Sequence, residues 1–186
     1  MPDPGWRVVR LDDVPSPDEL PVDDGVSEEE REAARAELRD DLNQPVFPDY
    51  PEFGSARWRA IRPYCGVTAF GVAATEAAGG EALLYPHTEA QYGHEEIYLV
   101  LEGRARFLFD GDGEVEVGRH ELLFVRPEVG RGAIALETPT VLFMVGGKPG
   151  AYEPPIWARD WRPPEEWLAA RRSAASETTS ETSSER

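Results

Sequence analysis

Between residues 57 and 147 the sequence breaks into short runs of β-type residues, and Gly or Pro marks most of the junctions. Turn signals include Gly79-Gly80, Glu102-Gly103 and the segment 110–113. No stretch of helical period separates the runs, and regularly spaced short strands are typical of sandwiches and barrels. We therefore predict an all-β fold with strands near 57–62, 65–74, 81–86, 95–102, 104–110, 114–117, 121–126, 131–137 and 140–146.

The chain has 186 residues, which suits one hydrophobic core with appendages. Five segments are predicted: an N-terminal strand within 1–15 (Trp6–Leu11), an acidic helix and Pro-rich strap at 16–56, the barrel at 57–158, a C-terminal arm or helix at 159–172, and a disordered tail at 173–186. The acidic helix is expected over 27–42, where a capping-box spacing begins at Ser27.

The charge of the chain excludes several partner classes. The formal net charge is −17, and residues 1–53 alone carry 16 acidic and 5 basic residues. Nucleic acids and anionic lipids both require a basic surface, so neither is an expected partner. No apolar run is long enough to span a bilayer, and the first residues lack a secretory core, so we expect a cytoplasmic protein.

Cys65 is the only cysteine, which excludes an intrachain disulfide and a thiolate metal cage. Any metal site must therefore use nitrogen and oxygen ligands. His94 and Glu96 are two residues apart in a predicted strand, so both side chains lie on one face and can reach a single cation. The pair is half of a site suited to Fe, Mn, Ni or Zn.

The stretch from Tyr85 to Gly103 resembles the first motif of the cupin superfamily, in which His-x-His precedes a Glu that is followed by six residues and Gly. Glu96 and Gly103 match the second half. The first half departs from the pattern. Either His87 stands for the first histidine and Glu89 for the second, or His87 is the second histidine behind an enlarged loop.

The second cupin motif runs Gly, five residues, Pro-x-Gly-x-x-His, and it falls on residues 118–132. Its framework is present, but Arg131 or Gly132 stands where the ligand histidine would be. Arginine stays protonated and cannot ligate a metal. An inward Arg131 could pair with Glu89 or Glu96 in place of a cation, which predicts a degraded or absent metal site.

The resemblance also covers segments 59–72 and 131–154, where the sequence is similar to small single-domain bacterial cupin proteins, of an actinobacterial type, that have no assigned activity. It implies a double-stranded β-helix with a jelly-roll-like barrel and short peripheral helices. It also implies a homodimer, which exchange of the strand Trp6–Leu11 could form.

Two functions remain open at this point. In the first, a small molecule binds in the barrel mouth with Arg131 as the anion partner, which would suit an acidic or carbonyl group. Glu89, Tyr98 and Phe109 are the other candidate ligand-binding residues. In the second, His87, His94 and Glu96 hold a divalent metal ion in an oxygenase or isomerase acting on a small organic substrate. The sequence does not decide whether the protein is an enzyme.

Overall fold

The computed structural model describes residues 7–19, 27, 29, 45, 47–52, 54–111 and 113–150. The chain divides into two units, Met1–Ala151 and Tyr152–Arg186, and all described residues belong to the first. Most of the predicted acidic helix at 27–42, the C-terminal arm at 159–172 and the tail at 173–186 lie outside the described residues.

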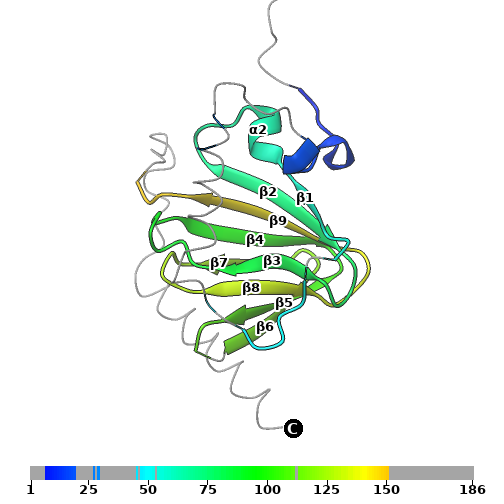
Figure 1. Cartoon of the computed structure of the whole chain (residues 1–186), viewed down its shortest axis with the longest axis vertical. Helices are drawn as coiled ribbons and strands as arrows, with labels where there is room; N and C mark the ends of the chain where they lie inside the picture. Colours follow the sequence, from blue (N-terminus) through cyan, green and yellow to red (C-terminus); the bar gives the residue numbers. More distant parts are fainter. Residues whose placement is uncertain are drawn as a thin grey trace, which may run out of the picture. The chain divides into compact units, whose positions relative to one another are not determined.

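The described residues form two antiparallel sheets (Figure 1). One sheet has five strands in the order β1-β2-β9-β4-β7, and the other has four in the order β3-β8-β5-β6. Apart from β1-β2 and β5-β6, neighbouring strands are not consecutive in the chain, so the chain crosses repeatedly between the sheets as in a double-stranded β-helix. The strands are β1 (Arg57–Arg59), β2 (Gly71–Ala77), β3 (Ala82–His87), β4 (Glu95–Glu102), β5 (Arg104–Phe109), β6 (Gly113–Gly118), β7 (Leu122–Val125), β8 (Arg131–Ala135) and β9 (Thr140–Gly147).

The core lies between the two sheets and follows from the alternation of each strand. On β4, Tyr98 and Val100 are fully buried, whereas Ile97 is 45% exposed on the opposite face. Phe107 of β5 meets Tyr98 across the core, with their ring centroids 5.2 Å apart. This confirms the predicted all-β, jelly-roll-like fold.

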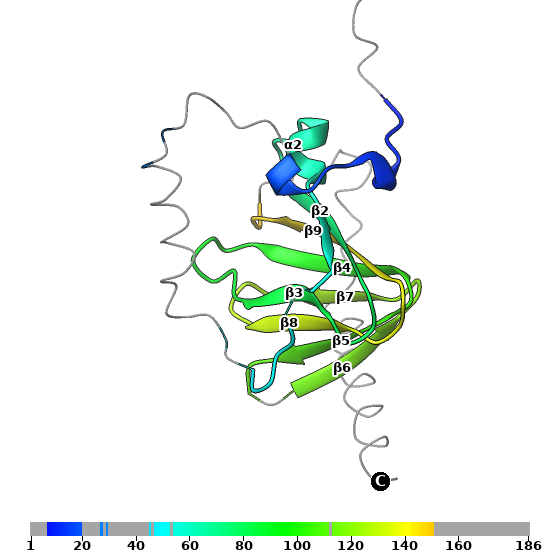
Figure 2. The same ribbon diagram turned by 45° about the vertical axis from the view of Figure 1, so that its right-hand side comes forward.

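The segment between β1 and β2 differs from the prediction. Strands were expected at 57–62 and 65–74, but α2 (Ile61–Cys65) interrupts them. Gly66 ends this helix with a left-handed φ of 72°, and its N–H donates to the carbonyls of Arg62 and Pro63. Figure 2 shows α2 beside β2, which it contacts.

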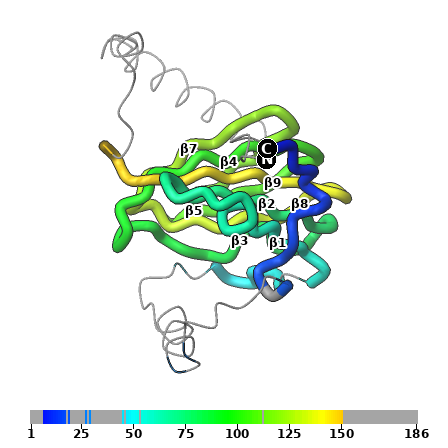
Figure 3. The backbone as a smooth tube through the Cα atoms, turned by 90° about the horizontal axis from the view of Figure 1, so that it is seen from above, coloured from blue at the N-terminus to red at the C-terminus, as the bar shows by residue number. Residues whose placement is uncertain are grey.

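The predicted strand at Trp6–Leu11 is wrong over its described part, residues 7–11. Residues 7–10 have no regular structure, and Leu11–Asp13 is a 3-10 helix, followed by a second at Pro17–Glu19. The buried Arg59 side chain donates to the carbonyls of Asp12 and Val14. These hydrogen bonds hold the segment next to β1, although it does not pair with β1 as a strand. Segment 7–19 and α2 lie on the same side of the strands in Figure 3.

Tyr50, in the Pro-rich strap, is anchored on the second sheet. Its hydroxyl lies within hydrogen-bond distance of the carbonyls of Leu84 on β3 and Ala133 on β8. A Cβ on Gly132 would come within 2.9 Å of the tyrosine ring, so the ring rests directly on the β8 backbone.

None of the helices in the described ranges is long and apolar enough to cross a membrane.

Candidate functional site

A cavity of about 550 Å³ opens between strands β2, β3, β4 and β9, beside α2 and the loop that joins β3 to β4. Its volume is within the usual range for small-molecule sites. Most of its wall is apolar, and its polar side chains come mainly from the stretch 85–96. The residues that line the cavity include Trp58, Arg62, Ala73, Tyr85, His87, Glu89, Tyr92, His94, Glu96, Met144 and Gly146.

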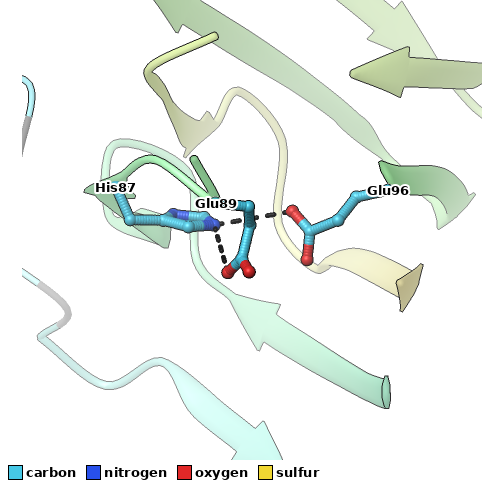
Figure 4. A group of neighbouring side chains, drawn as sticks. All are labelled: His87, Glu89 and Glu96. Carbon is cyan, nitrogen blue, oxygen red and sulfur yellow. Dashed lines mark ion pairs between the residues drawn. The ribbon is translucent and has the colours of Figure 1, made fainter. Parts of the chain in front are cut away.

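Three of these side chains converge: His87, Glu89 and Glu96 (Figure 4). One ligand atom from each lies within 4.8 Å of the other two. His87 ends β3, Glu89 is in the following loop, and Glu96 is near the start of β4. Nε2 of His87 is 3.5 Å from Oε2 of Glu96 and 3.9 Å from Oε1 of Glu89. We call these three residues the polar cluster.

The backbone fixes the orientation of His87. Its Nδ1 lies 2.8 Å from the carbonyl oxygen of Tyr85. Because a carbonyl can only accept, Nδ1 must carry the proton and donate. Nε2 is therefore the nitrogen that faces the two carboxylates, and it can either carry a second proton or offer its lone pair to a bound cation.

Glu89 is held by a turn that absorbs the extra length of the loop. Its N–H donates to the carbonyl of Pro127, and its own carbonyl accepts from Gly93, whose φ is 68°. Its Oε2 lies 2.8 Å from Nδ1 of His94, and the His94 ring stacks on Tyr92 with centroids 5.8 Å apart. The turn brings Glu89 beside Glu96 even though six residues separate them in the sequence.

Behind Glu96 lies the fully buried side chain of Arg131, at the start of β8. Its Nη2 donates to Oε2 of Glu96, its Nε donates to the Tyr98 hydroxyl at 3.1 Å, and its Nη1 donates to the carbonyl of Val129 at 2.9 Å. Tyr98 in turn donates its hydroxyl proton to the same Oε2 of Glu96. Glu96, Tyr98 and Arg131 thus form a closed hydrogen-bonded triangle, here called the Arg131 triad.

The triad fixes the ionisation of its members. Burial by itself would raise the pKa of Glu96, but hydrogen bonds from His87 and Tyr98, together with the Arg131 guanidinium, lower that pKa to about 2. Burial raises the pKa of Tyr98 well above its ordinary value, and the Glu96 charge raises it further. Glu96 is therefore a carboxylate and Tyr98 a neutral donor at physiological pH.

The polar cluster has donor atoms that suit a divalent cation, namely one imidazole nitrogen and carboxylate oxygens. The fit is incomplete, because the Glu96 oxygen that faces His87 already accepts from Arg131 and Tyr98. The metal set predicted from sequence was His87, His94 and Glu96. The structure instead groups His87 and Glu96 with Glu89, and Nδ1 of His94 is directed to Glu89.

The other predicted site residues lie at different distances from the cavity. Tyr98 and Arg131 are buried behind Glu96 and do not line it. Phe109 is not brought to it, since it packs on the edge of the core and borders a separate hollow beside Phe47. Sequence reasoning missed Trp58 and Arg62 as cavity residues. The inward position of Trp58 on β1 could have been inferred from the sequence. Arg62 could not be placed in the same way, because α2, which carries it, was not expected.

No family model and no curated protein sequence matches the chain. Many solved structures do match it. One is an RmlC-like cupin protein from Desulfovibrio desulfuricans, with 25% identity over 41% of this chain and 70% of that one and a TM-score of 0.37. Another is a cupin protein from Bacteroides fragilis, with 19% identity, coverage of 63% and 94%, and a TM-score of 0.44.

A third match is a sugar phosphate isomerase of the cupin superfamily from Silicibacter pomeroyi, with 17% identity, coverage of 59% and 73%, and a TM-score of 0.46. Likeness at this level concerns the fold and does not transfer an activity. The strand order and the position of the polar cluster at the mouth of the barrel define a cupin-type double-stranded β-helix.

Proposed function

We propose that this protein binds a small organic molecule in the barrel mouth. The observation that carries the proposal is the cavity of about 550 Å³, in which apolar walls surround the polar cluster at one end. Small-molecule sites typically combine apolar walls with a few polar groups, because the apolar surface supplies affinity and the polar groups fix the orientation of the ligand. Trp58 and Met144 would contact the body of the ligand, and the polar cluster would contact its polar group.

Arg131 supports binding without a resident metal. Its guanidinium already neutralises Glu96, and it stands at the point of the second cupin motif where a histidine would be. The Arg131 triad then keeps the Glu96 carboxylate at a fixed place on the cavity wall. Its oxygens need no cation to be held there.

The test compares ligand-induced stabilisation in two variants. Ala73 lines the cavity, so Ala73→Phe fills part of it, whereas Ala90→Phe adds the same bulk at an exposed loop position outside the cavity. Small metabolites that raise the Tm of the full chain should still raise it in Ala90→Phe and fail to do so in Ala73→Phe. Equal responses of the two variants would refute binding in this cavity.

A second candidate function is that of a metal-dependent oxygenase or isomerase, and the orientation of His87 favours it. With Nδ1 donating to Tyr85, Nε2 of His87 is directed to both carboxylates, as in a histidine that ligates a metal. His87, Glu89 and Glu96 would hold Fe, Mn, Ni or Zn, which would supply Lewis-acid or redox chemistry.

Metal analysis of protein purified without a histidine tag distinguishes the two functions. The metal-dependent function requires a stoichiometric ion that disappears in Glu89→Gln and persists in Glu95→Gln, because Glu95 lies on the opposite, exposed face of β4. Absence of an ion, with unchanged stability on addition of chelator and of Mn²⁺, would refute it.

A further inference from the structure

The cavity has an electrostatic preference beyond its size. We infer that its ligand carries a protonated amine, whose ammonium group binds between Glu89 and Glu96 while an apolar body lies along the wall. This inference rests on the proposed small-molecule function and names the chemical class of the ligand.

The first support is the formal charge around the polar cluster. Glu89 and Glu96 contribute two negative charges, and the Arg131 guanidinium, bonded to Glu96, contributes one positive charge. Apart from the histidines, these three side chains sum to −1. This charge matches a monocation, whereas a divalent ion would leave an excess positive charge next to the buried guanidinium. The net charge of −17 on the whole chain also favours the approach of cations.

The second support is the set of acceptors that remain. Oε2 of Glu96 accepts from Arg131 and Tyr98, and Oε2 of Glu89 accepts from His94. The other oxygen of each carboxylate, Oε1, accepts none of these three hydrogen bonds. An ammonium group has three donors and no acceptor, so it suits a place where acceptors are left over.

Gly146 leaves room for such a group beside Glu96. Gly146 lines the cavity, and a Cβ there would lie 3.2 Å from Oε1 of Glu96 and 3.0 Å from its Cγ. Any other residue at 146 would therefore crowd this oxygen. The position keeps Oε1 open to a ligand.

The third support is the aromatic part of the wall. Trp58, Tyr85 and Tyr92 all line the cavity, and Tyr92 is 43% exposed. The faces of aromatic rings attract cations, and their apolar surface receives a hydrocarbon body. Arg62 of α2 also lines the cavity.

The test uses three probes with one body and different head groups: 4-phenylbutylammonium, 4-phenylbutanol and 4-phenylbutanoate. Each is titrated into the full chain by isothermal calorimetry at neutral pH and about 0.15 M salt. We expect the ammonium to bind about 10-fold tighter than the alcohol, and the carboxylate more weakly than the alcohol. Glu89→Gln should abolish the advantage of the ammonium over the alcohol, whereas Glu95→Gln should leave this advantage in place.

The possible outcomes separate the two levels of the proposal. Equal affinity for the ammonium and the alcohol, or an ammonium advantage that survives Glu89→Gln, overturns the amine while small-molecule binding stands. Ammonium binding that survives Ala73→Phe overturns both, because it then occurs outside the cavity. Failure of all three probes to bind also counts against both. Displacement of the bound ammonium by equimolar Mn²⁺ would overturn the amine in favour of the metal-dependent function.

Gly146→Ala provides a second variant that leaves all charges in place. The added methyl group crowds Oε1 of Glu96 and should weaken ammonium binding several-fold, which reduces the advantage of the ammonium over the alcohol. If ammonium affinity is unchanged in a variant whose Tm equals that of the parent protein, Glu96 is not part of the ammonium site.

Discussion

Arg131 donates a hydrogen bond to Glu96 across the interior of the barrel, and the two residues belong to different sheets. Arg131 begins β8 of the four-stranded sheet, and Glu96 lies on β4 of the five-stranded sheet. The contact therefore joins the two sheets and at the same time sets the charge of the cavity. The same pair therefore bears on the stability of the fold and on the proposed binding of a ligand.

The first prediction concerns the stability that this pair provides. Arg131→Met should reduce the free energy of unfolding by about 3–5 kcal/mol, because it leaves the Glu96 carboxylate buried without its counter-charge. In the double variant Arg131→Met/Glu96→Gln the loss should be smaller than the sum of the two single losses. Urea unfolding of all four proteins measures the coupling, and strictly additive losses would show that the pair is not coupled.

The second prediction is a pH dependence of stability. The pKa of Glu96 is about 2 in the folded protein, below its ordinary value of 4.5. A lowered pKa means that the folded state favours the carboxylate, so this stabilisation is complete above pH 4.5 and is lost as the pH falls toward 2. Its size is on the order of 3 kcal/mol. In Glu96→Gln it is absent, so the difference in unfolding free energy between wild type and variant should shrink across this window. A constant difference would contradict the assignment.

The strands could be predicted from sequence because period-two alternation and Gly or Pro turns are local signals. All nine segments correspond to strands, and β4 has the predicted bounds Glu95–Glu102. The segment 60–70 could not be predicted in the same way. Its composition is β-rich, but Pro63 and the left-handed Gly66 close a short helix there. The β propensity of these residues alone does not show that the chain forms a helix here.

The candidate site could be predicted in part, because motif position indicates Glu96 and Arg131 and leaves Glu89 or Glu96 as the partner of Arg131. The membership of Glu89 in the polar cluster depends on the turn at 89–93 and its anchor on Pro127, which is 38 residues further along the chain. Such a contact has no local signal. The metal set predicted from sequence therefore contained His94, whereas Glu89 was one alternative for the second histidine of the motif.

The third prediction tests the strap. Tyr50→Phe removes the hydroxyl that lies within hydrogen-bond distance of the carbonyls of Leu84 and Ala133, next to the irregular pairing of β3 with β8. The loss should be about 1–3 kcal/mol in the free energy of unfolding. Tyr64→Phe serves as the control because Tyr64 is 36% exposed on α2. Equal stability of Tyr50→Phe and wild type in urea would show that the strap does not contribute through this hydroxyl.

The fourth prediction concerns the outer face of the five-stranded sheet. Ile97 on β4 pairs with Phe124 on β7, and Leu99 pairs with Leu122, so these side chains form one apolar surface. Leu122 is 64% exposed and Phe124 is 50% exposed. A contiguous apolar patch on a protein surface commonly marks an interface.

We expect a second copy of the chain to cover this patch and so form a homodimer. At −17 per chain, two copies repel each other, and they can meet most easily where the facing side chains are uncharged. A two-fold axis through the patch would place the same residues on both sides. Exchange of a strand at Trp6–Leu11 is a poorer route, since residues 7–10 form no strand and Leu11–Asp13 is a 3-10 helix.

In sedimentation equilibrium, the dissociation constant of the dimer should be at least about 10-fold larger for Leu122→Ser/Phe124→Ser than for wild type, because each copy loses apolar area from the interface. The unfolding free energy of the monomer should change little, since both side chains are exposed within one chain. Val115→Ser is the matched control, because Val115 is 40% exposed on β6 of the other sheet. A wild-type protein that sediments as a monomer at 100 μM would refute the dimer, and a dimer unaffected by Leu122→Ser/Phe124→Ser would place its interface on another surface.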